Sequence, residues 1–524
     1  MSPEAPERTD AVLFLSPCSL ALTFPELGIP QLAGYLRARG RSVRALDLNA
    51  LFLGEFLKSP GARGLLRARL AARKIRPAPP ANFAGTPWGP KRLEGDSAAA
   101  AAWSDLLAIK AGSWEIGEVA RASAEHDWLY DLFFERYVAP AAAGAALAGF
   151  SVLTHHQVLP ALYLSRRLKE RYPGLKVCLG GPWCTASMGA VEDWPELFDA
   201  ADAVVFYSGE EPLAGLLDWA RGRRRLAGIP GLAWREGGRV RRTAVRPGPA
   251  LEKLPPPDFT GFDLGLYPRR TLPYQTASGC EWGRCTFCYH CLPDNRFRVK
   301  PPALVARHLA VLKRRWGVGS FWLADLTAPE EMLDGLSREL TRRGLELEWT
   351  AMTRAGKRWT PEFAARLAAS GCREAYFGLE TADKEGLRRI NKGLTPELFA
   401  RSVRACAGAG IRVSVFLLKY PGQGEGEFRR TLEYVRGLRG AVSAIVVSDF
   451  ELGRASNAMG RLGEFGITLP PGSGRDIRSF SLPYRAPLRA DWRLDRLGIE
   501  REFEGPVPPP VRRRRFTSGR DKKK

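Results

Sequence analysis

Between residues 271 and 450, short apolar segments alternate with longer amphipathic ones, and this alternation constrains the fold more than any other feature. Short apolar runs are typical of buried parallel strands, and apolar residues at every third or fourth position predict helices. The predicted strands are 271–279, 320–326, 347–352, 374–380, 412–420 and 444–450, and the predicted helices are 301–317, 360–371, 394–410 and 427–440. This order predicts a partial (β/α)6 TIM-like barrel with its active site at the carboxyl ends of the strands.

The N-terminal half shows a second α/β series. Its predicted strands are 11–17, 42–50, 145–154, 176–182 and 203–212, and its predicted helices are 28–40 and 159–174. We predict a Rossmann-like domain over 1–246 with a helical insertion at about 51–144, a Pro-rich linker at 247–268 and a barrel domain at 269–470. Residues 471–524 form a C-terminal extension, and we expect its basic end to be disordered.

Small and polar residues follow the predicted N-terminal strands. In an open parallel sheet, ligands bind beyond the carboxyl ends of the strands, where short residues let the backbone approach a ligand. The alternative is that the glycines only make strand-to-helix turns. The candidate binding residues are Ser16, Ser151, Thr154, Gly180, Gly181, Gly209 and Glu210.

Composition bounds the class of protein. The chain has 524 residues, 45% of them hydrophobic and 26% charged, which is typical of globular proteins. The net charge of +23 would attract polyanions, but basic residues are spread along the chain and only the tail concentrates them, so we expect no nucleic-acid partner. No apolar run of about 18 residues exists and the N-terminus lacks a basic leader, so we expect a cytoplasmic protein without a membrane span.

Three of the nine cysteines, Cys280, Cys285 and Cys288, directly follow the first strand of the barrel series. Three thiolates can hold three irons of a [4Fe–4S] cube and leave the fourth iron free for chemistry. The alternative is a structural zinc site, which needs four ligands and would have to recruit Cys291 or His290.

This cysteine pattern resembles the radical SAM superfamily, whose motif is C-x3-C-x2-C with an aromatic residue before the last cysteine, the place of Phe287 here. The spacing in this chain is C-x4-C-x2-C, with Gly283 as the inserted residue. The resemblance implies that the open iron binds S-adenosylmethionine (SAM). It also implies that an electron donor such as flavodoxin or ferredoxin drives cleavage of SAM to methionine and a 5′-deoxyadenosyl radical.

The segments 378–395 and 409–428 resemble the fourth and fifth strand region of that family. The resemblance implies that Glu380 bonds the SAM ribose and that the fifth strand, around Val413, lines the adenine. Arg354 also falls at a strand end, where its guanidinium suits the SAM carboxylate, with a surface ion pair as the alternative.

The N-terminal segments resemble the cobalamin-binding domain that precedes many such barrels. The D-x-H-x-x-G motif that provides a cobalt-ligating histidine is absent, and His155 and His156 do not match its position. The resemblance therefore implies cobalamin without that lower ligand.

We predict a cobalamin-dependent radical SAM enzyme, a possible C-methyltransferase acting on a small-molecule or peptide substrate. A methylthiotransferase acting on tRNA is one alternative, although the spacing of Cys18, Cys178 and Cys184 does not match its second cluster site. A cobalamin or iron–sulfur sensor is the non-enzymatic alternative.

Overall fold

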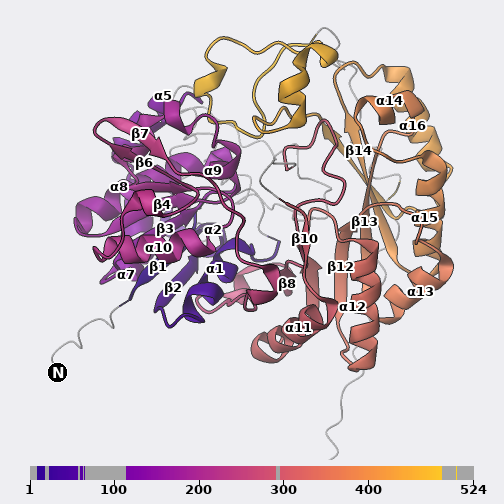
Figure 1. Cartoon of the computed structure of the whole chain (residues 1–524), viewed down its shortest axis with the longest axis horizontal. Coiled ribbons are helices and arrows are strands. Elements are labelled where there is room, and N and C mark those ends of the chain that lie inside the picture. The colour runs from indigo at the N-terminus through magenta and orange to yellow at the C-terminus, as the bar shows by residue number, and fades with distance from the viewer. Residues whose placement is uncertain are drawn as a thin grey trace, which may run out of the picture.

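The computed structural model describes residues 9–17, 23–56, 59–62, 64, 114–290, 296–486 and 503. Most of the predicted insertion, Cys18, Cys291 and the basic tail lie outside the described residues. Two α/β units stand side by side, with the N-terminal unit on the left of Figure 1 and the barrel on the right. Among the helices that the structure describes, none combines the length and apolar character needed to cross a bilayer.

The N-terminal unit is built on a seven-stranded sheet with the order β2-β1-β3-β4-β5-β6-β7. The first five strands of this order are parallel and the last two are antiparallel. The strands are β1 (Ala11–Leu15), β2 (Val43–Asp47), β3 (Leu147–Ser151), β4 (Lys176–Gly180), β5 (Ala203–Val205), β6 (Leu232–Glu236) and β7 (Arg239–Arg242). The predicted parallel strands are confirmed, whereas the β6–β7 hairpin was not predicted.

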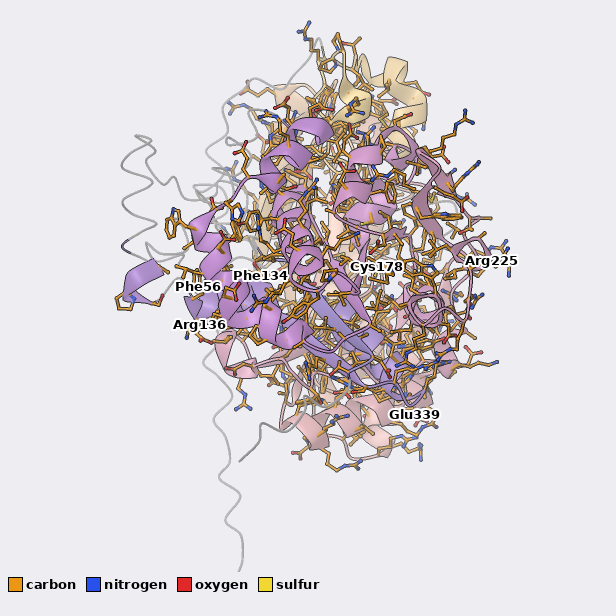
Figure 2. All side chains as sticks on the ribbon, turned by 90° about the vertical axis from the view of Figure 1, so that its left-hand side faces the viewer. Phe56, Phe134, Arg136, Cys178, Arg225 and Glu339 are labelled. Carbon is orange, nitrogen blue, oxygen red and sulfur yellow. The ribbon has the colours of Figure 1, made fainter. Side chains whose placement is uncertain are left out.

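Helices cover both faces of this sheet, because successive side chains of a strand point to opposite sides. Leu13 packs in the core under α1 (Gly28–Arg37) and α10 (Glu210–Ala220), whereas Phe14 packs under α8 (Val158–Arg171). The second face also carries α2 (Leu48–Gly54), α5 (Ile116–Ala124), α6 (Trp128–Phe133), the π-helix η2 (Phe134–Val138) and α7 (Ala139–Ala142). Figure 2 shows this unit face on, with Cys178 in its interior and Arg136 and Arg225 at its rim.

The second unit is a six-stranded sheet in which every neighbouring pair is parallel and the strands follow chain order, β8-β11-β12-β13-β14-β15. The strands are β8 (Thr271–Tyr274), β11 (Ser320–Leu323), β12 (Glu348–Thr353), β13 (Cys372–Glu380), β14 (Arg412–Lys419) and β15 (Ala444–Asp449). Its helices are α11 (Pro302–Trp316), α12 (Glu330–Arg342), α13 (Pro361–Ala369), α14 (Lys384–Arg389), α15 (Pro396–Gly408) and α16 (Glu425–Arg436). These helices form the outer layer in Figure 1, so the predicted partial (β/α)6 barrel is confirmed.

The segment predicted as a linker packs against both units. Phe259 and Phe262 are buried in a core that is continuous with both units. Gly261 has a φ of +98°, and a Cβ there would lie 2.1 Å from the carbonyl oxygen of Ala45, so only glycine fits. This segment also holds two short 3-10 helices, η7 (Leu251–Lys253) and η8 (Leu264–Leu266).

The chain after β15 returns to the N-terminal unit, as the yellow segment across the top of Figure 1. It contains the 3-10 helices η9 (Asn457–Phe465) and η10 (Ser473–Arg475). The indole of Trp183 donates to the carbonyl oxygen of Ile477 at 2.7 Å, and Arg475 pairs with Glu115 and Glu196. This return segment therefore ties the two units together.

Candidate active site

The three cysteines of the motif lie on one loop at the carboxyl edge of the barrel sheet. Strand β8 leads through the two-residue strand β9 (Ala277–Ser278), which pairs with β10 (Arg298–Val299), directly into Cys280. Gly283, the inserted residue of the motif, has a φ of +59°, a left-handed conformation that glycine adopts without strain. Cys285 is 7% exposed, and Cys280 and Cys288 are half-buried.

The cysteine loop is fastened to the segment that follows α14. The indole of Trp282 donates to the carbonyl oxygen of Asn391 at 2.8 Å, and the backbone N–H of Thr286 donates to the carbonyl oxygen of Ile390 at 3.0 Å. A Cβ on Gly393 would lie 2.3 Å from the Trp282 ring. The indole thus occupies space that only a glycine at position 393 leaves open.

Glu380 ends β13 beside this loop and forms a buried ion pair with Lys392, with 2.8 Å between Nζ and Oε1. The side chains of the pair are only 10% and 9% exposed, and Lys392 Nζ also lies 5.6 Å from the centre of the Phe287 ring. Burial opposes the charge of Lys392, but the Glu380 carboxylate and the Cys285 thiol outweigh it and raise the pKa of Lys392. Burial raises the pKa of Cys285, while the charges of Lys392 and Arg354 act to lower it.

Arg354 follows β12 and belongs to the same group of residues. Its guanidinium donates to the carbonyl oxygen of Lys392 at 2.7 Å and lies 5.0 Å from the centre of the Trp282 ring. The barrel register explains this meeting, because Thr353 pairs with Phe377 and the strands run parallel, so their ends share one edge. Val413 is not part of this group, since it lies at the opposite end of β14 and is fully buried.

A buried carboxylate fixes the turn from which the cysteine loop begins. Asp325 accepts hydrogen bonds from the backbone N–H groups of Thr276 and Ala277, at 2.7 and 2.8 Å, and from the Thr276 hydroxyl. Burial raises the pKa of Asp325 to about 6, against the effect of these hydrogen bonds. Asp325 therefore positions the backbone that leads into Cys280.

Within the described part of the chain, no three His, Cys, Asp or Glu side chains gather around a point where one metal ion would bind. Each thiol of a [4Fe–4S] cube binds a different iron, so such a site does not require the three sulfur atoms to converge on one ion. The thiols present, on one loop beside buried cationic groups, have the chemistry that a cluster needs.

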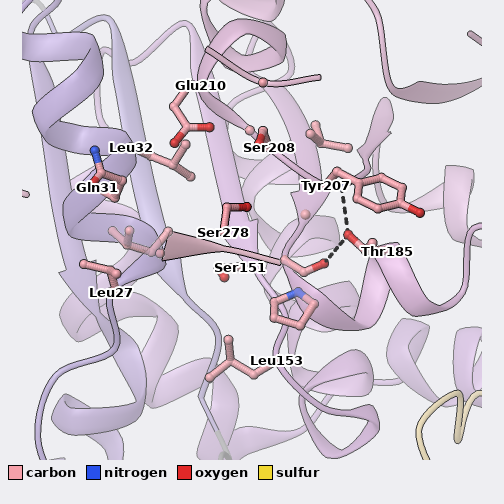
Figure 3. Close-up of a pocket in the computed structure, with 18 of the residues that line it drawn as sticks. Leu27, Gln31, Leu32, Ser151, Leu153, Thr185, Tyr207, Ser208, Glu210 and Ser278 are labelled. Carbon is pink, nitrogen blue, oxygen red and sulfur yellow. Dashed lines mark hydrogen bonds between the residues drawn. The ribbon is translucent and has the colours of Figure 1, made fainter. Parts of the chain in front are cut away.

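A cavity of about 490 Å³ lies between the N-terminal sheet and the residues Gly279 and Tyr289, which flank the cysteine loop. Figure 3 shows part of its lining, with Ser151 and Glu210 among the labelled side chains. Its N-terminal wall includes Ser151, Gly180, Gly181, Gly209 and Glu210, which the sequence predicted as binding residues. The carboxyl ends of β1, β3 and β4 lie at the same edge of the sheet, because Leu15 pairs with Ser151 and Ser151 pairs with Gly180. The barrel wall consists of Gln275, Ala277, Ser278, Gly279, Tyr289, His290, Arg298, Ala324 and Leu326.

Two predicted binding residues, Ser16 and Thr154, do not line this cavity. The Ser16 hydroxyl donates to the carbonyl oxygen of Gln157 at 3.1 Å, and Thr154 is the N-cap residue of the 3-10 helix η3 (His155–Gln157). His155 and His156 also lie outside the lining and pack against Trp114. Burial, together with His156 and Arg478, lowers the pKa of His155 to about 2.

The sequence analysis missed several lining residues. One of them is Glu26, which lies just before α1 in a stretch of sequence without a recognisable pattern. Burial, with a smaller contribution from Asp47, raises the pKa of Glu26 to about 7. Tyr207 has a φ of +58°, and its backbone N–H donates to Thr185 Oγ1 at 2.8 Å (Figure 3). A tyrosine carries no sequence signal for a left-handed backbone, so this turn could not have been predicted.

Comparison with known proteins finds a family model that matches most of the barrel. Residues 274–435 match the model described as the Radical SAM superfamily. An uncharacterized methyltransferase of Pyrococcus horikoshii is 27% identical over 274 residues, which cover 50% of this chain and 58% of that protein. The 4'-phospho-dehydrooxetanocin synthase of Priestia megaterium is 21% identical over 57% of this chain and 40% of its own length. This chain thus spans 58% of the length of the first curated relative and 40% of the length of the second.

Two solved structures share the arrangement of both units. The radical SAM methyltransferase TsrM from Kitasatospora setae, described with cobalamin and a [4Fe–4S] cluster bound, aligns at 18% identity with a TM-score of 0.56 over 88% of this chain and 81% of its own. OxsB, described as a cobalamin-dependent SAM radical enzyme, aligns at 13% identity with a TM-score of 0.60 over 90% of this chain and 64% of its own. At these identities the likeness shows the fold alone. The family match over 274–435 contains the cysteine loop, so this part of the chain is similar to the radical SAM superfamily in both sequence and motif.

Proposed function

We propose that this protein is a cobalamin-dependent radical SAM enzyme that transfers a methyl group to a carbon atom of a small-molecule or peptide substrate. The observation that carries the proposal is the 490 Å³ cavity, which has the carboxyl edge of a Rossmann-like sheet on one side and the cysteine loop on the other. Residues 1–246 would form the cobalamin-binding domain and 269–470 the radical SAM core. The names of the relatives support this reading.

The cavity residues suit a corrin, which has apolar ring faces and a rim of amide side chains. Apolar side chains from α1, α10 and the end of β3 line the wall, namely Leu27, Leu32, Leu153 and Leu213. Hydrogen-bonding groups lie among them, namely Gln31, Ser151, Ser208 and Glu210 (Figure 3). At Gly181 a Cβ would lie 2.7 Å from the carbonyl oxygen of Val152, so the backbone packs closely at the strand end.

Cys280, Cys285 and Cys288 would hold the [4Fe–4S] cluster. When bound, the cluster provides the electron that cleaves SAM. Lys392 keeps the Glu380 carboxylate in place at 2.8 Å, where that carboxylate can accept hydrogen bonds from the SAM ribose. Arg354 donates from Nη2 to the carbonyl oxygen of Lys392, and the other N–H groups of its guanidinium can serve an anionic group of SAM. We further propose a reduced flavodoxin or ferredoxin as the electron donor and the cytoplasm as the compartment.

The test is anaerobic reconstitution with iron, sulfide and hydroxocobalamin, followed by desalting, iron counting and a visible spectrum. We expect about four irons and one corrinoid per chain. Cys285→Ala should lose the irons and retain the corrinoid. Leu153→Trp should fill part of the cavity and lose the corrinoid while retaining the irons, and Leu132→Trp, at a site 51% exposed, is its control. A wild-type protein that binds iron but no corrinoid would contradict the cobalamin part of the proposal.

A further inference from the structure

A second cavity, of about 400 Å³, lies beside the first, between the N-terminal unit and the segment that follows β15. The two cavities have Thr185, Ala186 and Tyr207 in common, so they adjoin through a shared wall. The remaining lining residues are Met188, Gly189, Arg454, Ala455, Ser456, Asn457 and Gly460.

The polar groups of this cavity are incompletely satisfied. Arg454 Nη2 donates to the carbonyl oxygens of Ser473 and Asp476, at 2.9 and 2.7 Å. The Nε atom of Arg454 is buried and has no acceptor among the described residues. Ser456 is 5% exposed, and its Oγ also has no hydrogen-bond partner in the described part of the chain. A buried donor without an acceptor is costly, so these groups favour a ligand that brings acceptor oxygens.

The charge of the lining residues indicates the sign of the charge on that ligand. Arg454 is the only charged side chain among the described residues that line the cavity, and the groups that fix its guanidinium are neutral carbonyls. Its ring contact, with 5.4 Å to the centre of Trp194, is also with a neutral group. The Asp476 carboxylate also acts on the charge of Arg454, but it forms its ion pair with Arg478 at 2.6 Å. A guanidinium held only by neutral carbonyls binds a carboxylate or a phosphate more strongly than a neutral acceptor.

The cavity is connected to the reaction centre. Asn457, another lining residue, donates from Nδ2 to the backbone carbonyl of Cys285 at 3.2 Å. A ligand held by Arg454 and Ser456 would therefore lie one side chain away from the cysteine loop, with the larger cavity adjoining it at the three shared lining residues.

We propose that the second cavity is a substrate subsite that binds an anionic group, a carboxylate or a phosphate, through Arg454 Nε and Ser456 Oγ. The anion anchors the substrate so that its reacting carbon reaches into the larger cavity. This inference rests on the proposed function for the identity of the ligand as substrate, but the binding site itself does not depend on radical chemistry.

The test titrates the reconstituted full-length protein with two probes at constant ionic strength: trifluoroacetate followed by 19F NMR line width, and inorganic phosphate followed by 31P NMR line width. Arg454→Gln should weaken binding of the preferred probe at least tenfold. Ser456→Asp, which places a carboxylate beside Arg454, should do the same. Ser456→Ala leaves the bonds from Arg454 to residues 473 and 476 in place, so a several-fold loss in this variant cannot be assigned to misfolding of that segment.

Arg461→Gln is the matched control, because it removes the same charge from a neighbouring exposed ion pair with Glu464 and should leave probe binding unchanged. Saturable trifluoroacetate binding that depends on Arg454 indicates a carboxylate substrate, and saturable phosphate binding that depends on Arg454 indicates a phosphorylated one. Equal binding by the wild type, Arg454→Gln and Arg461→Gln, or no saturable binding, overturns the proposal. Iron and corrinoid contents of the same preparations report separately on the proposed function, so the two can fail independently.

Discussion

The ion pair between Lys392 and Glu380 allows a sharp prediction about the barrel. The Nζ–Oε1 distance is 2.8 Å and both side chains are at most 10% exposed, so removing the lysine charge leaves a carboxylate buried without its partner. Breaking a buried pair in this way costs about 3–5 kcal/mol. We expect Lys392→Met to lower the free energy of unfolding by that amount. The Lys392→Met/Glu380→Gln double variant, which buries no charge, should recover most of the loss.

The assay is urea unfolding of the apoprotein followed by tryptophan fluorescence, with the transition midpoint compared at equal slope. Lys384→Met is the matched control, because Lys384 and Glu397 are 3.8 Å apart and 78% and 70% exposed, and solvent screening leaves such surface pairs with little effect on stability. The reasoning is refuted if Lys392→Met shifts the midpoint no more than Lys384→Met does. It is also refuted if the double variant is as unstable as the single one.

Three further predictions concern the cysteine loop and its surroundings. Gly393→Val should displace Trp282 and reduce iron content after reconstitution by more than half, whereas Gly408→Ala, where a Cβ meets nothing within 4 Å, should leave iron content unchanged. Asp325→Ala should lower the unfolding free energy by about 3 kcal/mol or more because two buried N–H donors lose a charged acceptor, and Asp325→Asn should lose less; equal losses in urea unfolding would argue against the hydrogen bonds as the cause. Burial lowers the pKa of Lys300 from 10.5 to about 8, so the unfolded chain binds more protons between these values, and the stability of the wild type relative to Lys300→Met should rise from pH 8 to pH 10; a difference that stays flat or falls over this window contradicts the assignment.

The barrel strands were predictable because each is buried and reads as a short apolar run bounded by turn residues. Helix α12 was left unassigned, although its buried Met332, Leu333, Leu336 and Leu340 have helical spacing. The β6–β7 hairpin was also missed. Its signal was the dipeptide Gly237-Gly238, where both φ angles are positive, as a two-residue hairpin turn requires.

The candidate site was predictable only where its residues form a motif within a short stretch of sequence. The spacing of the three cysteines points to a cluster without any knowledge of the fold. Lys392, Arg454 and Asn457 carry no such pattern, and their roles come from contacts across the structure, such as the hydrogen bond from Asn457 to a carbonyl 172 residues earlier in the chain. Ordinary surface residue types acquire a role there because the fold buries them.

The return segment after β15 explains how one chain can build a site from two units. Its residue Ile477 accepts the Trp183 hydrogen bond, and the Ser479 hydroxyl lies 2.7 Å from that of Ser187, so the segment is fastened to the N-terminal unit at α9 (Pro182–Ala186) and the turn behind it. About twenty residues earlier the same segment carries Asn457, which holds the cysteine loop. Because these contacts bracket both cavities, the distance between the N-terminal sheet and the cysteine loop is set by the segment and not by the linker alone. A substrate anchored at Arg454 and Ser456 would be held by the same segment that fixes the separation of the two proposed cofactor sites.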